Sequence, residues 1–238
     1  MTMAEESHSA ISGAGNLQRT VLLGLLRLQA ILALLIFLPA GSLRYWQGWL
    51  FWIVFFACVL VVTLYFVQHD PHLIENRMKA GPGAEQETSQ KIIQAFTGTL
   101  AAALVIISGL DHRYRWSSVA TPIVLLGDAL IVFGFAIVFQ VFRENSFAAS
   151  TIKVEAEQRV ISTGLYGWVR HPMYVGGALM LLAAPLALGS LWGVLIGIAL
   201  TAAIVVRLLD EERYLSINLP GYDAYRRKVR YRLIPMVW

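Results

Sequence analysis

The sequence predicts an all-α protein, a polytopic membrane bundle of five or six transmembrane helices whose last apolar block folds back as a helical hairpin. Composition is the first observation behind this prediction. Of 238 residues, 57% are hydrophobic and only 14% are charged, whereas soluble domains usually carry roughly 25% charged residues. With a mean hydropathy of +0.62, the chain is suited to a lipid solvent. The length of the apolar runs and the placement of Lys and Arg are the other two observations.

Four apolar runs are each close to the ~20 residues that a helix needs to cross a bilayer. They cover residues 21–40, 49–67, 92–110 and 122–142. The first run follows an acidic start and is too long for a cleaved signal peptide. We therefore expect it to be the first membrane-spanning helix.

The last apolar block, residues 175–209, is too long for one straight helix and too short for two full spans. It contains Pro185 and Gly189, residue types that end helices and form turns. A tight hairpin of two short or tilted helices, turning between residues 185 and 190, fits this length best.

Lys and Arg placement agrees with a hairpin. If the N-terminus is cytoplasmic and the last block crosses an even number of times, the inner segments hold fifteen Lys and Arg residues and the outer loops hold three. This asymmetry is what the positive-inside rule predicts. We therefore expect a protein of the cell membrane with both termini in the cytoplasm.

Several functional classes are disfavoured by the same features. The basic net charge is explained by membrane orientation, so nucleic-acid binding is not expected. Cys58 is the only cysteine, so no disulfide or cysteine-rich metal site is expected within one chain. The oligomeric state cannot be read from the sequence.

The chain is predicted to be a single integral membrane domain, residues 1–238, with two unequal parts. Residues 1–142 are helices joined by loops. Residues 143–238 contain two polar segments, one before and one after the hairpin. These segments should meet at the two feet of the hairpin, which are the points where its first helix begins and its second helix ends. Arg170 and His171 precede the first hairpin helix. Arg207 and Glu211, four residues apart, share one face of the second helix. Ionisable groups at a membrane boundary are functional candidates.

A longer pattern runs through these residues. It reads Gly-x-Tyr-x-x-x-Arg-His-Pro-x-Tyr-x-Gly from Gly164 to Gly176. The hairpin follows, then an Arg and a pair of Glu, then Gly-Tyr-x-x-Tyr and finally Arg-Leu-Ile-Pro. In this order the pattern resembles the isoprenylcysteine carboxyl methyltransferase family over residues 143–238. Phospholipid and thiol methyltransferases and some sterol reductases share parts of this C-terminal architecture.

The resemblance implies S-adenosyl-L-methionine as cofactor, bound in a cytoplasmic C-terminal pocket between the ends of the last helices. It assigns Arg207 to the acceptor, as the catalytic and substrate-binding residue. The residues that it assigns to the cofactor, with Glu155 as the weakest match, are Glu155, Gln158, Arg159, Val160, Ile161, Tyr166, His171, Pro172, Met173, Tyr174, Glu211 and Glu212.

The chemistry of methyl transfer suits these residue types. The cofactor carries an activated methyl group, so the protein mainly supplies proximity and alignment. Glu211 or Glu212 could hold its ammonium group, and His171 or the nearby helix N-terminus its carboxylate. A carboxylate acceptor needs no general base and could be oriented by the guanidinium of Arg207. A lipophilic or lipidated acceptor would explain the membrane location, together with contacts to membrane lipids.

Other interpretations stay open at this point. Glu212 points about 100° away from Glu211 around the helix and could be structural. Arg207 and Glu211 could be an ordinary ion pair. A phospholipid, amine or thiol methyltransferase, an NADPH-dependent membrane reductase of the sterol type, and a non-catalytic scaffold are the alternative functions.

Overall fold

The structure is a computed structural model that describes residues 3–78, 81–85, 88–148, 154 and 158–238. These residues contain helices and no strand, so the all-α prediction is confirmed. Its long helices are α1 (Met3–Ala40), α2 (Trp46–His69), α4 (Thr88–Tyr114), α5 (Thr121–Glu144), α6 (Pro172–Ala187) and α7 (Leu191–Asn218), and its short ones are α3 (Pro71–Met78), η1 (Pro82–Ala84), η2 (Gly164–Gly167) and α8 (Tyr222–Lys228).

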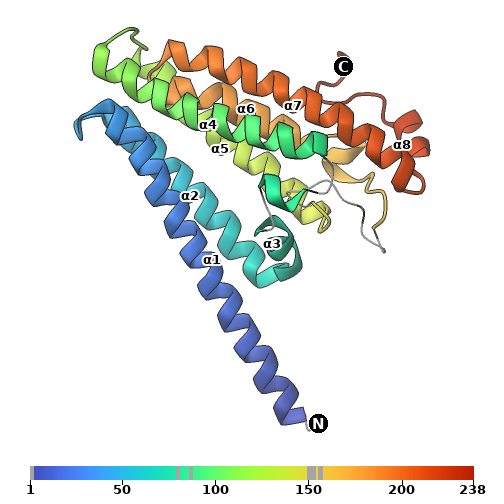
Figure 1. Cartoon of the computed structure of the whole chain (residues 1–238). Helices are drawn as coiled ribbons and strands as arrows, with labels where there is room; N and C mark the ends of the chain where they lie inside the picture. Colours follow the sequence, from blue (N-terminus) through green and yellow to red (C-terminus); the bar gives the residue numbers. More distant parts are fainter. Residues whose placement is uncertain (1–2, 79–80, 86–87, 149–153, 155–157) are drawn as a thin grey trace.

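Within the described residues, five helices are long and apolar enough to span a membrane: residues 17–40 of α1, and α2, α4, α5 and α7. α6 is shorter, at 16 residues. Figure 1 shows α4 to α7 packed side by side, with α1 and α2 forming a second pair and the N-terminal half of α1 extending beyond the rest. The protein is therefore an integral membrane helical bundle, as the apolar runs predict.

The last apolar block is a hairpin, and its predicted position is confirmed. α6 ends at Ala187 and α7 begins at Leu191. Gly189 makes the turn with φ +70°, a left-handed conformation that is costly for other residues. The Ser190 side chain then caps α7 by accepting a hydrogen bond from the Gly193 amide at 3.0 Å.

A cluster of hydrogen-bonded polar groups holds this turn against the rest of the bundle. The buried Asp111 carboxylate accepts hydrogen bonds from the Ser190 hydroxyl at 2.6 Å and from the Ser117 amide at 2.7 Å. The Tyr45 hydroxyl donates to the Leu188 carbonyl. These contacts tie α1, α2 and α4 to the hairpin turn at the end of the bundle opposite to α3 and α8 (Figure 1). They fix the position of the hairpin turn, and therefore also the position of the start of α6 and the end of α7 at the opposite end of the bundle.

α5 and α6 pack closely because small residues face one another. A Cβ atom added at Gly134 would lie 2.9 Å from the Gly176 carbonyl oxygen, and one added at Gly176 would lie 2.8 Å from the Gly134 oxygen. Close backbone approach through small residues is a common way to pack helices in membranes, where the hydrophobic effect does not drive helices together. Gly176 is thus used for contact between helices.

We expect Gly127→Ala to lower the free energy of unfolding by about 1–3 kcal/mol, the usual range for overpacking. The new methyl group would lie 2.6 Å from the Ala187 amide nitrogen, which is backbone and cannot rotate away. Gly98→Ala in α4 is the matched control, because nothing lies within 4 Å of its added Cβ. Equal stability of the two variants in denaturant titrations in detergent would contradict this packing argument.

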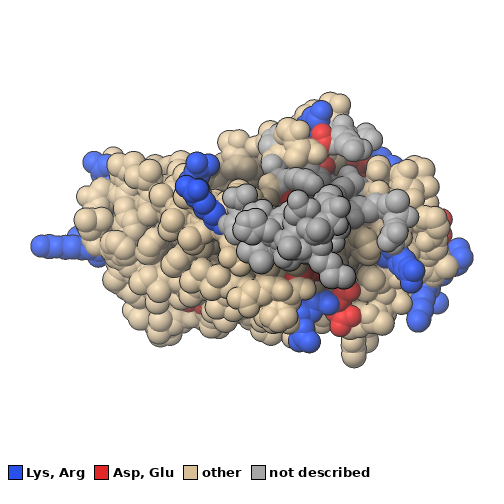
Figure 2. All heavy atoms as spheres, turned by 90° about the horizontal axis from the view of Figure 1, so that it is seen from below, with Lys and Arg blue, Asp and Glu red and all other residues tan. Residues whose placement is uncertain are grey.

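Charged residues are concentrated at one end of the bundle. In Figure 2, the half that carries α3 and α8 shows most of the visible Asp and Glu and many of the Lys and Arg residues. The opposite half is mainly uncharged, apart from a few Lys or Arg side chains near its end. The loops at the charged end therefore carry the candidate chemistry.

Candidate active site

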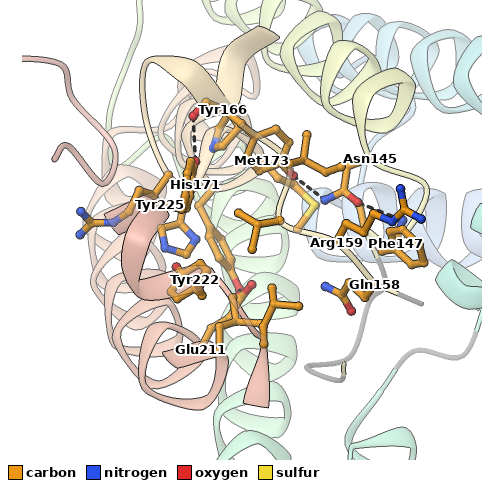
Figure 3. Close-up of a pocket in the computed structure, with 18 of the residues that line it drawn as sticks. Asn145, Phe147, Gln158, Arg159, Tyr166, His171, Met173, Glu211, Tyr222 and Tyr225 are labelled. Atoms are coloured by element: carbon orange, nitrogen blue, oxygen red, sulfur yellow. Dashed lines mark hydrogen bonds between the residues drawn. The ribbon is translucent and has the colours of Figure 1, made fainter. Parts of the chain in front are cut away.

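A cavity of about 290 Å³ lies at the charged end, between the two feet of the hairpin and the segments that flank it. It is bordered by the ends of α3, α5, α6 and α7, by η2 and by α8. Figure 3 shows Tyr166, His171, Tyr222, Tyr225 and Glu211 on one side and Asn145, Phe147, Gln158 and Arg159 on the other. Segments far apart in sequence thus form one site.

On the cavity wall, two side chains of α7 contact one side chain of α6. The Tyr174 hydroxyl donates to the Glu211 carboxylate at 2.5 Å, and the Arg207 Nε donates to the same hydroxyl at 3.2 Å. Tyr174 therefore bridges Arg207 and Glu211. The residue predicted for the acceptor and the residue predicted for the cofactor lie side by side on one wall.

Glu212 faces away from this chain and holds three basic side chains. Its Oε1 accepts from the Arg170 Nε at 2.6 Å and lies 3.1 Å from the His171 Nε2, and its Oε2 accepts from the Arg232 Nε at 2.9 Å. Because an ionised carboxylate only accepts hydrogen bonds, His171 must carry a proton on Nε2. Glu212 is not among the described residues that line the cavity. We therefore assign it a positioning role, whereas Glu211 is in place to contact a ligand.

The C-terminal segment closes the site by pairing with the residues before α6. The Arg170 and His171 amides donate to the carbonyls of Tyr231 and Arg232 at 2.9 and 3.1 Å. The Arg170 Nη1 donates to the Val229 carbonyl at 3.0 Å. The buried Arg170 therefore links the start of α6 to the C-terminal segment, and these hydrogen bonds hold the two against each other.

Aromatic side chains form the wall between η2 and α8. The Tyr225 hydroxyl donates to the Tyr166 carbonyl at 2.8 Å, and the Tyr166 hydroxyl accepts from the Asn145 Nδ2 at 3.0 Å. Burial raises the pKa of Tyr166 to about 12, so its hydroxyl stays neutral at physiological pH. Burial and the nearby Glu212 also raise the pKa of Tyr222. A neutral aromatic wall of this kind suits a planar heterocycle such as adenine.

The other residues predicted from the sequence are distributed as follows. Gln158, Arg159, Val160, Ile161, Pro172 and Met173 line the cavity. Pro172 occupies the first turn of α6, where its missing N–H has no cost. Glu155, the weakest assignment, lies outside the described residues.

The lining residues that were not assigned a role from the sequence include Arg77, Asn145, Tyr222 and Tyr225. Asn145 lies in the segment after α5, where its Oδ1 accepts from the Phe147 amide at 3.0 Å. Tyr222 and Tyr225 belong to the Gly-Tyr-x-x-Tyr pattern, but the sequence alone does not predict that either ring lines the cavity. Arg77 gave no sequence signal, because it lies in a polar segment between two spans.

Glu85 is not among the described residues that line the cavity, but it contacts Arg207, which does line it. Its side chain is fully buried, and its Oε1 accepts from the Arg207 Nη2 at 2.8 Å and from the Gln94 amide. α7 is held to α4 once more, because the Ser89 hydroxyl and the Gln90 amide donate to Asp210. The loop before α4 therefore determines where the guanidinium of Arg207 points.

Comparison with known proteins relates this region to a methyltransferase family and to two longer proteins. Residues 122–218, from α5 through α7, match the model of the family described as phospholipid methyltransferase. The chain is 30% identical over 137 residues to the lamin-B receptor of Drosophila melanogaster, a match that covers 52% of this chain and 18% of the receptor. It is also 30% identical over 139 residues to the Delta(14)-sterol reductase TM7SF2 of Mus musculus, covering 52% of this chain and 33% of the reductase. The chain thus spans a third or less of these two relatives.

Proposed function

We propose that the protein is an S-adenosylmethionine-dependent membrane methyltransferase that methylates a carboxylate on a prenylcysteine-like or other lipophilic acceptor. The observation that carries this proposal is the contact chain Arg207–Tyr174–Glu211 in a cavity between the hairpin feet. The match to the phospholipid methyltransferase model covers all three residues and supports the methyltransferase class. The carboxylate acceptor rests on Arg207.

The charge and the aromatic rings of the lining residues support this choice of cofactor. Glu211 offers a carboxylate at the cavity wall for an ammonium group, and Tyr166, Tyr222 and Tyr225 offer rings for the adenine. When bound, S-adenosylmethionine would supply a methyl group that its positively charged sulfur activates for transfer to the acceptor oxygen. The chain itself binds and orients the two partners, which is the main requirement of an in-line displacement.

Arg207 is the proposed acceptor ligand. Its guanidinium presents N–H donors in one plane, and the contacts to Tyr174 and Glu85 hold it in position. A guanidinium that is fixed in this way can orient a carboxylate so that one oxygen faces the methyl group. The acceptor oxygen is already nucleophilic, so the described residues need not remove a proton.

We further propose that residues 1–238 act as one membrane domain, in which the segments before α5 complete a core formed by residues 143–238. The charged end of the bundle would face the cytoplasm, where the cofactor is made, in keeping with the fifteen-to-three distribution of Lys and Arg. The acceptor's apolar tail would remain among the membrane lipids.

An NADPH-dependent reductase is the second candidate, because one relative is a sterol reductase and because Arg77, Arg159 and Arg207 all border the cavity. Phosphate groups are bound by such arginines. The carboxylate of Glu211 on the same wall favours a ligand with an ammonium group over NADPH.

Calorimetry separates the two functions. The protein purified in detergent is titrated with S-adenosylmethionine, with S-adenosylhomocysteine and with NADPH. Binding of the first two in the micromolar range is expected. If neither binds at millimolar concentration, the methyltransferase proposal fails, and binding of NADPH alone would establish the reductase class.

A further inference from the structure

Arg77 brings a second guanidinium to the cavity from outside the hairpin. It lies in the last turn of α3, and its Nη1 is 3.4 Å from the Ala148 carbonyl oxygen and 3.5 Å from the Met173 sulfur. Its Cζ lies 4.8 Å from the centre of the Phe142 ring. The aromatic face and the carbonyl thus hold the head of Arg77 at the cavity wall.

α3 is a rigid support for this side chain. Leu73 and Ile74 are buried against Phe66 of α2 and against the end of α5. The Asp70 side chain accepts a hydrogen bond from the Leu73 amide at 3.0 Å and begins the helix. An arginine on a packed helix loses little further freedom when a ligand binds, so that more of its interaction energy appears as affinity.

Arg77 and Arg207 border the same cavity from different elements, α3 and α7. Burial, and to a smaller extent the positive charge of Arg207, lower the pKa of Arg77 to about 10. Both groups remain charged at neutral pH. Two half-buried cations that border the same cavity are favourable neighbours for an anion that lies between them.

We propose that Arg77 and Arg207 together form a carboxylate-binding subsite of the cavity. The proposal rests on the methyltransferase function, because it assigns one anionic group of that reaction to these two guanidiniums. Two reactants carry a carboxylate: the cofactor at its amino-acid end, and the acceptor. Both would present the same chemistry to the subsite, so the experiment must distinguish them.

Glu85 holds the guanidinium of Arg207 in a fixed position at this subsite. Its buried carboxylate fixes one edge of the Arg207 guanidinium.

The first arm of the test addresses the cofactor. S-adenosylhomocysteine and its decarboxylated analogue, which lacks only the carboxylate, are titrated into the wild type, Arg77→Met and Arg77→Lys. A carboxylate held by Arg77 gives a preference for S-adenosylhomocysteine of roughly 10- to 100-fold in the wild type. Arg77→Met would abolish this preference and Arg77→Lys, which keeps the charge but not the planar fork, would retain part of it.

The second arm addresses the acceptor. N-acetyl-S-farnesylcysteine is compared with its neutral carboxamide as a ligand for the same three proteins. If the acceptor carboxylate occupies the subsite, the preference for the acid is lost in Arg77→Met while the affinity for S-adenosylhomocysteine stays unchanged. Loss of preference in one arm supports the proposal and identifies the source of the carboxylate.

Arg213→Met is the matched control, because this exposed arginine lies on α7 near Arg207 but outside the described lining of the cavity. It should leave both preferences unchanged. The proposal is overturned if the wild type shows no preference in either arm, or if Arg77→Met retains both preferences. Failure of the wild type to bind S-adenosylhomocysteine at all would instead count against the methyltransferase function. Thermal unfolding of Arg77→Lys shows whether α3 has kept its place.

Discussion

Glu212→Ala is expected to destabilise the protein by about 3–5 kcal/mol, the cost of leaving a buried cation without its partner. Arg170 is only 7% exposed and its Nε lies 2.6 Å from the Glu212 carboxylate. The substitution also removes the anchor of Arg232 at 2.9 Å. Because the C-terminal segment pairs with Arg170 and His171, it should become accessible to protease and the start of α6 should lose its fixed position.

Glu211→Ala is the control for this prediction. Glu211 is the neighbouring residue and has the same side chain, but its described hydrogen bond is to the neutral Tyr174 hydroxyl. Its loss should change the free energy of unfolding by about 1 kcal/mol. Thermal unfolding in detergent and limited proteolysis measure both effects. Equal destabilisation of the two variants would contradict the different roles assigned to the paired glutamates.

Arg207→Ala and Glu211→Ala are expected to impair different halves of the reaction. Glu211→Ala should weaken S-adenosylhomocysteine binding by roughly 10- to 100-fold, the usual effect of losing a hydrogen bond to a charged group. Arg207→Ala should reduce kcat/KM for the acceptor by at least as much, and it should leave that affinity nearly unchanged when the acceptor carboxylate is the one that lies between Arg77 and Arg207. The Tyr174–Glu211 contact does not include Arg207, so the cofactor side can stay intact.

Tyr174→Phe tests the connection between the two halves. Removing the hydroxyl breaks the contact to Glu211 and the contact to Arg207 together, so both the cofactor affinity and the acceptor kinetics should decline. Calorimetry and initial rates measured on one preparation give the two quantities. If Arg207→Ala and Glu211→Ala reduced cofactor affinity equally, the division of roles would be wrong.

Local sequence patterns predict most of the fold. Apolar runs of about the bilayer thickness mark α1, α2, α4 and α5, and the intermediate length of residues 175–209 indicates the hairpin. Proximity of Tyr174 to Arg207 and Glu211 follows from the hairpin alone, because an even number of crossings returns the chain to the same side. These features depend only on residue type and spacing.

Contacts between distant segments could not be predicted in this way. Glu85 and Arg77 lie in a polar stretch whose composition is that of a loop, and their partners are far along the chain. The role of Glu212 depends on three basic residues that converge only after folding. Spacing shows that Glu211 and Glu212 differ in direction, but not which of them faces the cavity.

The shortness of α6 has a consequence for how the protein sits among lipids. Its 16 residues extend about 24 Å, less than the roughly 30 Å hydrocarbon thickness of a bilayer. Such hydrophobic mismatch thins the surrounding bilayer or draws the helix end below the headgroups. Arg207 lies at a similar depth, because it is about 24 Å along α7 from Leu191. Arg207 should therefore lie close to the level of the lipid headgroups, where the polar end of a membrane-embedded acceptor of the proposed kind would also lie.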